Sequence, residues 1–111
     1  MNIELDYSNI DQEEVAKSIG LPSKHMPILF ASFKEESTKS LTDLEEAIAQ
    51  NNLTDITFYA HAIKGSAGNL KFNALYELTK EMEFCAKNGD ASYDYLDSFN
   101  DIKASIATIN I

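Results

Sequence analysis

The chain has 111 residues, a length that predicts one domain, and 44% of them are hydrophobic, enough for a packed core. Its 18 acidic residues face nine lysines and no arginine, and the net charge of −9 argues against nucleic acid as a partner. No apolar run approaches the roughly 20 residues of a membrane span. A single cysteine excludes an intramolecular disulfide, and the N-terminus lacks the pattern of a signal peptide, so we expect a cytoplasmic protein without a membrane partner.

Apolar residues recur at helical spacing along the first half of the chain. A short helix is predicted over residues 11–19, because Gly20 is a typical helix stop and Pro22 lies just beyond it. The next helix begins between residues 23 and 27, where proline is tolerated in the first turn, and continues to about Gln50. Its predicted core positions are Phe30, Phe33, Leu41, Leu44 and Ile48.

Three further helices are predicted in the second half. The first of them begins near Asn52 or Thr54, since Asn52 is a favourable cap and Asp55 suits the first turn. The second covers residues 73–87, and the third follows the stop at Asn88-Gly89-Asp90. The predicted core positions of these helices are Ile56, Ala60, Ile63, Ala67 and Leu70, then Leu75, Leu78, Met82 and Cys85, then Leu96, Phe99, Ile102, Ile106 and Ile109.

The pattern of helices predicts an all-α fold. Four substantial helices with short connections favour an antiparallel four-helix bundle over about residues 23–109, with the short N-terminal helix of residues 11–19 as a lid. We expect a single domain over residues 1–111.

The helix around His61 departs from an ordinary amphipathic pattern. His61 shares a face with Gly65 and Gly68, beside the apolar stripe, so its ring is expected to reach solvent. Each glycine in a helix interior costs about 0.8–1.0 kcal/mol relative to alanine. Two interpretations of these glycines stay open: a surface left bare for the approach of another protein, or close packing against a neighbouring helix.

The same segment is free of acidic residues. Between Ile56 and Tyr76 the only charged side chains are those of Lys64 and Lys71. Lys64 lies one helical turn after His61 and can reach a group attached to the ring. A segment without acids suits a phosphoryl group on an otherwise acidic protein. Burial of the helix would explain the missing acids as well, but it does not explain Lys64.

The string HAIKGSAGNL at residues 61–70 resembles the signature of histidine-containing phosphotransfer (HPt) domains. In that family the histidine is followed by lysine and glycine at the third and fourth positions, then by small residues and leucine. The resemblance extends over about residues 22–108 and includes the pair Met82-Glu83. Many members have glycine directly after the leucine, where this chain has Lys71, and we expect Asn69 to adopt the left-handed conformation instead.

The resemblance implies a histidine phosphotransfer protein of a two-component phosphorelay. His61 would accept a phosphoryl group from a receiver-domain aspartate and pass it to another, while Lys64 neutralises charge on the phosphoryl oxygens. The expected partners are response-regulator receiver domains, whose site brings Mg²⁺, and a hybrid sensor histidine kinase. The candidate docking residues are Phe58, Gly65, Ser66 and Gly68.

The chain lacks a phosphate-binding glycine loop, so we predict a phosphoryl carrier that is not itself an enzyme. Partner domains would phosphorylate and dephosphorylate it, and it needs no cofactor of its own. His25, His61 and Cys85 lack the spacing of metal ligands. We expect a monomer that docks through a small, transient interface.

Two alternatives stay open. The first is a non-catalytic HPt-like binding module, which docks a signalling partner without being phosphorylated. The second is a domain excised from a larger kinase.

Overall fold

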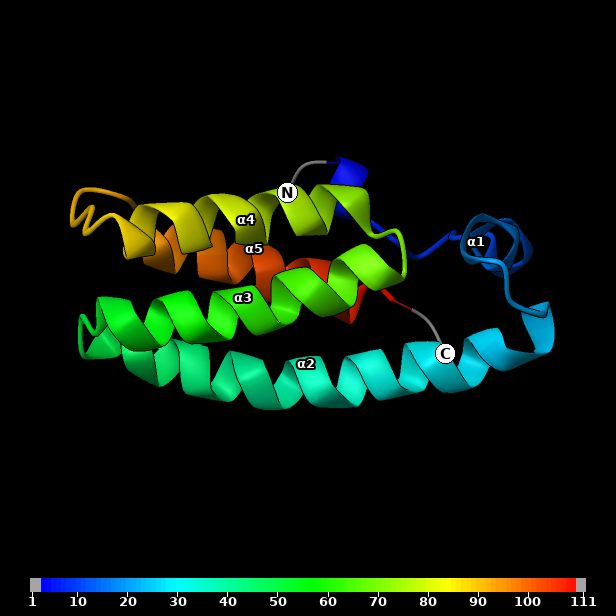
Figure 1. The fold of residues 1–111 in the computed structure, drawn as a ribbon. Coiled ribbons are helices and arrows are strands. Elements are labelled where there is room, and N and C mark those ends of the chain that lie inside the picture. The colour runs from blue at the N-terminus through cyan, green and yellow to red at the C-terminus, as the bar shows by residue number, and fades with distance from the viewer. Residues whose placement is uncertain (1–2, 110–111) are drawn as a thin grey trace.

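The computed structural model describes residues 3–109, and its regular secondary structure over this range consists of helices alone (Figure 1). The elements are the 3₁₀ helix η1 (Ile3–Leu5), α1 (Gln12–Ile19), the 3₁₀ helix η2 (Ser23–His25), α2 (Met26–Ala49), α3 (Leu53–Asn69), α4 (Asn73–Lys87) and α5 (Tyr95–Ala107). The all-α prediction is confirmed. None of these helices is both long and apolar enough to cross a membrane. Residues 1–2 and 110–111 of the predicted domain lie outside the described range.

The four long helices pack in neighbouring pairs. Helix α3 packs against α2 and α4, and α5 packs against the same two helices. Figure 1 shows α2 to α5 side by side, with α1 at the end of the molecule where α2 begins. There α1 contacts η2 and α2. The helix predicted as a lid therefore covers one end of the molecule.

The core runs between the long helices. Its largest fully buried apolar side chains are Met26, Phe30, Leu44, Ile56, Ile63, Phe72, Leu75, Met82, Ile102 and Ile109. Phe72, in the connection before α4, stacks against Tyr7, Phe30 and Phe33 with ring centroids 4.8, 5.3 and 5.1 Å apart. The prediction that Leu96 lies in the core is wrong, because its side chain is 55% exposed. Tyr95 occupies the inward position at the start of α5, and a neighbour in sequence points about 100° away around a helix.

Four of the helices end in the same kind of turn. Gly20, Asn51, Lys71 and Gly89, which follow α1 to α4, have φ angles of 75°, 53°, 63° and 72°. After α3, the Lys71 amide donates to the Gly68 carbonyl at 3.2 Å and the Phe72 amide donates to the Ala67 carbonyl at 3.0 Å. This pair of bonds is the Schellman motif, which needs a left-handed residue at the position of Lys71.

The prediction for Asn69 is therefore wrong. Asn69 is the last residue of α3, and the left-handed conformation falls on Lys71, two residues later, because the hydrogen bonds of the turn set that position. A side chain in this conformation costs roughly 1–2 kcal/mol, which glycine avoids.

The N-terminal segment is bound to α4 and α5, a feature that helical periodicity does not predict. The Ser105 hydroxyl donates to the Leu5 carbonyl at 2.7 Å, and the Tyr7 amide donates to Thr108 Oγ1 at 2.8 Å. The Leu75 amide donates to the Tyr7 hydroxyl at 3.2 Å. Phe72 offers no side-chain cap to α4, so Tyr7 satisfies an amide in its first turn that would otherwise lack a partner.

We predict that Tyr7→Phe lowers the free energy of unfolding by about 1 kcal/mol, because the half-buried Leu75 amide loses its acceptor. Urea unfolding followed by circular dichroism measures this difference. Tyr59→Phe is the matched control, since the Tyr59 hydroxyl makes no hydrogen bond within residues 3–109. Equal midpoints for the two variants would show that the Tyr7 hydroxyl does not support α4.

Candidate functional site

His61 lies in the middle of α3 with its ring turned outward. The helix begins after Asn52, whose side-chain oxygen accepts a hydrogen bond from the Asp55 amide at 3.1 Å, as the sequence predicts. Its buried positions are Ile56, Ala60, Ile63 and Ala67. This stripe turns the neighbouring face toward solvent, and the His61 side chain is 66% exposed.

A glutamate on α4 joins His61 to Lys64. One carboxylate oxygen of Glu83 lies 2.8 Å from His61 Nδ1, and the other lies 2.5 Å from Lys64 Nζ. The carboxylate thus bridges two side chains of α3 from the neighbouring helix. The sequence alone assigns Glu83 no role, and its one signal for this residue is the resemblance, which includes the pair Met82-Glu83.

The bridge determines which ring nitrogen of His61 carries hydrogen. Partial burial raises the pKa of Glu83, but the hydrogen bonds from Lys64 and His61 outweigh this effect and leave the pKa below its usual value. An ionised carboxylate only accepts hydrogen bonds. The neutral ring must therefore donate from Nδ1, which leaves the lone pair of Nε2 free.

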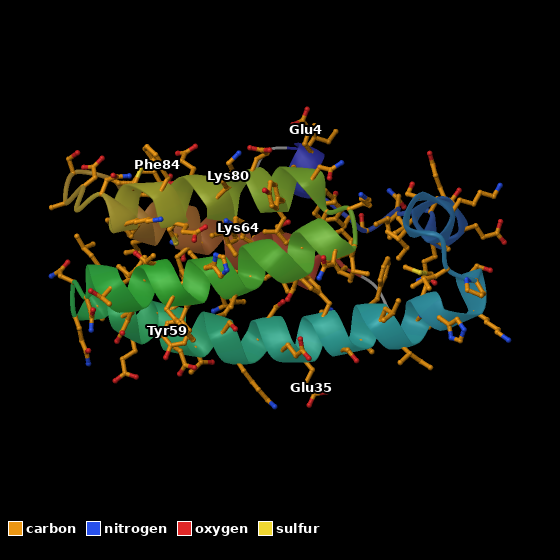
Figure 2. All side chains as sticks on the ribbon, in the orientation of Figure 1. Glu4, Glu35, Tyr59, Lys64, Lys80 and Phe84 are labelled. Carbon is orange, nitrogen blue, oxygen red and sulfur yellow. The ribbon has the colours of Figure 1, made fainter. Side chains whose placement is uncertain are left out.

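Lys64 lies on the side of α3 that faces α4. Its side chain is only 21% exposed, and its ammonium group is held by Glu83. Figure 2 shows Lys64 between the ribbons of α3 and α4, with Lys80 and Phe84 on α4. Lys64 therefore has a fixed position one helical turn from His61, as its spacing in the sequence suggests.

The two glycines beside His61 have different surroundings. A Cβ atom on Gly65 would meet no atom within 4 Å, whereas on Gly68 it would lie 3.1 and 3.3 Å from carbons of the Tyr76 ring. Of the two interpretations of these glycines, the bare surface therefore applies to Gly65 and the close packing to Gly68.

The other candidate docking residues differ in exposure. Phe58, one turn before His61, is 67% exposed and stacks edge-on against Tyr59. Ser66 is half-buried. Phe84, which the sequence did not single out, is also 67% exposed and directly follows Glu83. Two exposed aromatic side chains thus come from the two helices that form the His61 site.

The described residues give little support for a metal site or a reactive cysteine. Across positions 3–109, no group of three or more His, Cys, Asp or Glu side chains is arranged to hold a metal ion. Cys85 is half-buried on α4, and burial raises the pKa of its thiol, which disfavours the reactive thiolate.

Comparison with known families identifies the chain. The model of the Hpt domain family matches residues 28–109, which is more than half of the sequence. The chain belongs to the Hpt domain family. The match leaves η1, α1 and η2 outside it. A search of the curated proteins gave no match.

The fold agrees with this assignment. The crystal structure of histidine-containing phosphotransfer protein B (HptB) from Pseudomonas aeruginosa PAO1 is similar, with a TM-score of 0.76 and 22% sequence identity. The similarity covers 87% of this chain and 84% of that chain. This Hpt protein is thus a histidine phosphotransfer protein of a phosphorelay, in a family of phosphocarriers that interact with receiver domains and kinases.

We predict that Gly65→Ala raises the free energy of unfolding by about 0.8–1.0 kcal/mol, the usual gain for alanine over glycine inside a helix. Gly68→Ala is expected to gain less, because its new Cβ would press on the Tyr76 ring. Urea unfolding of both variants measures the difference. Equal gains would contradict the separate roles of the two glycines.

We also predict that Glu83→Gln reverses the tautomer of His61. Lys64 still needs an acceptor, so the amide oxygen would turn toward it and the amide NH₂ would donate to Nδ1. Imidazole ¹⁵N shifts at about pH 8, above the ordinary histidine pKa of about 6.5, should show Nδ1–H in the wild type and Nε2–H in the variant. His25 serves as an internal control in the same spectra. A wild type with Nε2–H would contradict the bridge.

Proposed function

We propose that this Hpt protein carries its phosphoryl group on Nε2 of His61. The observation that supports this most directly is the contact between Glu83 and Nδ1, since it leaves Nε2 as the free nucleophile of an exposed ring. The lone pair of Nε2 would attack the phosphorus of a receiver's aspartyl phosphate. The bond to the aspartate oxygen breaks as the N–P bond forms, and the aspartate leaves as a carboxylate. The reverse reaction would deliver the group to another receiver.

Glu83 and Lys64 are proposed to support this reaction from fixed positions. Attack by a neutral imidazole places positive charge on the ring, and the Glu83 carboxylate next to Nδ1 would stabilise that charge. Phosphoryl transfer depends mainly on positioning and charge neutralisation. Lys64, held one turn from His61, would neutralise charge on the phosphoryl oxygens.

The surface around His61 suits docking of a receiver domain. Gly65 leaves the helix surface bare, while Phe58 and Phe84 offer exposed aromatic contacts of the kind enriched in protein interfaces. Gly68 would act indirectly, by letting Tyr76 pack close to α3. Ser66 stays a candidate docking residue.

The partners we propose are response-regulator receiver domains, which would bring Mg²⁺, and a hybrid sensor histidine kinase. These partners would phosphorylate and dephosphorylate a monomeric carrier in the cytoplasm. We further propose that residues 1–111 form one domain and that α2 to α5 form an antiparallel four-helix bundle. The pairwise packing of each of these helices against two others supports this arrangement.

The test is intact-protein mass spectrometry after mixing with phosphorylated receiver domains and Mg²⁺. We predict one acid-labile, alkali-stable phosphoryl group on the wild type and none on His61→Gln. His25→Gln, the matched control, should be phosphorylated like the wild type. If no receiver domain of a panel and no small phosphoramidate phosphorylates the wild type, the carrier proposal fails. The non-catalytic binding module would then be favoured.

A further inference from the structure

Lys71 occupies a position at which the fold favours glycine. Among the four left-handed helix ends of this chain, two use glycine and one uses asparagine, which tolerates this conformation well. Only the turn after α3 uses a long, charged side chain. The turn would form at least as readily with glycine, so local stability does not account for the lysine.

The surroundings of Lys71 indicate a role for its charge. The side chain is exposed, and within residues 3–109 it forms no ion pair. Lys64, the other cation between Ile56 and Tyr76, is already paired with Glu83. Both lysines and Glu83 line the same hollow, which lies mainly over α4 and is also lined by Lys80, Lys87, Glu4, Glu77, Glu81 and Asp101. Lys71 follows α3 directly and is therefore the unpaired cation closest to His61 in the sequence. Lys80 on α4 forms no ion pair within residues 3–109 either, but its ammonium group lies over the Tyr76 ring, 5.9 Å from the centroid.

We propose that Lys71 is a docking residue that contacts the acidic rim of a receiver domain's phosphorylation site. This inference rests on the proposed function, which makes a site built around an acceptor aspartate and Mg²⁺ the partner of His61. An acidic carrier repels such a partner over most of its surface. The stretch of residues 56–76 has no acid, and Lys64 neutralises the adjacent Glu83 carboxylate, which reduces the repulsion near His61. Lys71 adds an attraction.

The position of Lys71 just beyond the end of α3 places it at the edge of the docking surface. Eight residues at about 1.5 Å each place the end of α3 at Asn69 about 12 Å from His61, and Lys71 lies two residues beyond that end. A transient interface that buries about 600 Å² per partner has a radius of about 14 Å if it is round. A charge at such a rim acts mainly on the association rate and on its salt dependence. We therefore expect Lys71 to influence how fast a receiver docks more than the chemistry at His61.

The experiment measures receiver affinity by titration and phosphoryl transfer by kcat/KM, at low and high ionic strength. Lys71→Gln should lower both by about three- to fivefold at low salt, with the difference disappearing at high salt, where charges are screened within a few ångströms. Lys71→Arg should stay within about twofold of the wild type. Lys103→Gln is the matched control, since Lys103 is exposed on α5, which packs against α2 and α4.

The variant Lys71→Gly tests the charge of Lys71 separately from the conformation of the turn. Lys71→Gly should raise the thermal midpoint of unfolding, because glycine relieves the strain of the left-handed conformation. It should still lower receiver affinity at low salt by as much as Lys71→Gln does. Variants of Lys71 and Lys103 that behave alike at low salt would overturn the inference. If the wild type receives no phosphoryl group but Lys71→Gln still weakens receiver binding, the carrier function is overturned and the docking role of Lys71 stands. A wild type that binds no receiver domain would overturn both.

Discussion

The bridge from Glu83 to His61 and Lys64 is the interaction on which the site depends. A carboxylate that is only 16% exposed is stable when cationic or donor groups surround it, and α3 supplies both. In return, the carboxylate orients the ring and holds the lysine one turn away. Because its members come from α3 and α4, the site has its geometry only when these two helices pack against each other.

Two residues near His61, Gly65 and Lys71, lower the stability of α3 and of the turn that follows it. Glycine has a low helix propensity, and at position 65 no neighbouring atom would exclude a side chain. Lys71 adopts the left-handed conformation, which glycine would adopt without strain. The buried stripe of α3 offsets these losses. The N-terminal segment, outside the family match, contributes as well, since the Tyr7 hydroxyl accepts from the first turn of the helix that carries Glu83.

Apart from the turn at Lys71, the features that the sequence did not resolve share one cause. Spacing along a helix predicts which residues share a face, but it does not predict how that helix is rotated against its neighbours. Leu96 has the spacing of a core residue, but in the structure Tyr95 occupies the inward position and Leu96 is exposed. Gly65 and Gly68 could not be told apart, because only the position of the Tyr76 ring separates them. Glu83 received no role, because its partners lie on another helix.

The sequence by itself determined the helices and the exposed face of α3. Apolar periodicity and caps such as Asn52 act within a few residues, so α1 and α4 match their predicted ranges to within a residue. The HAIKGSAGNL string pointed to the family on which the function rests. Only the tertiary structure decided how His61 is held, because the carboxylate that orients its ring lies 22 residues away and reaches it through helix packing.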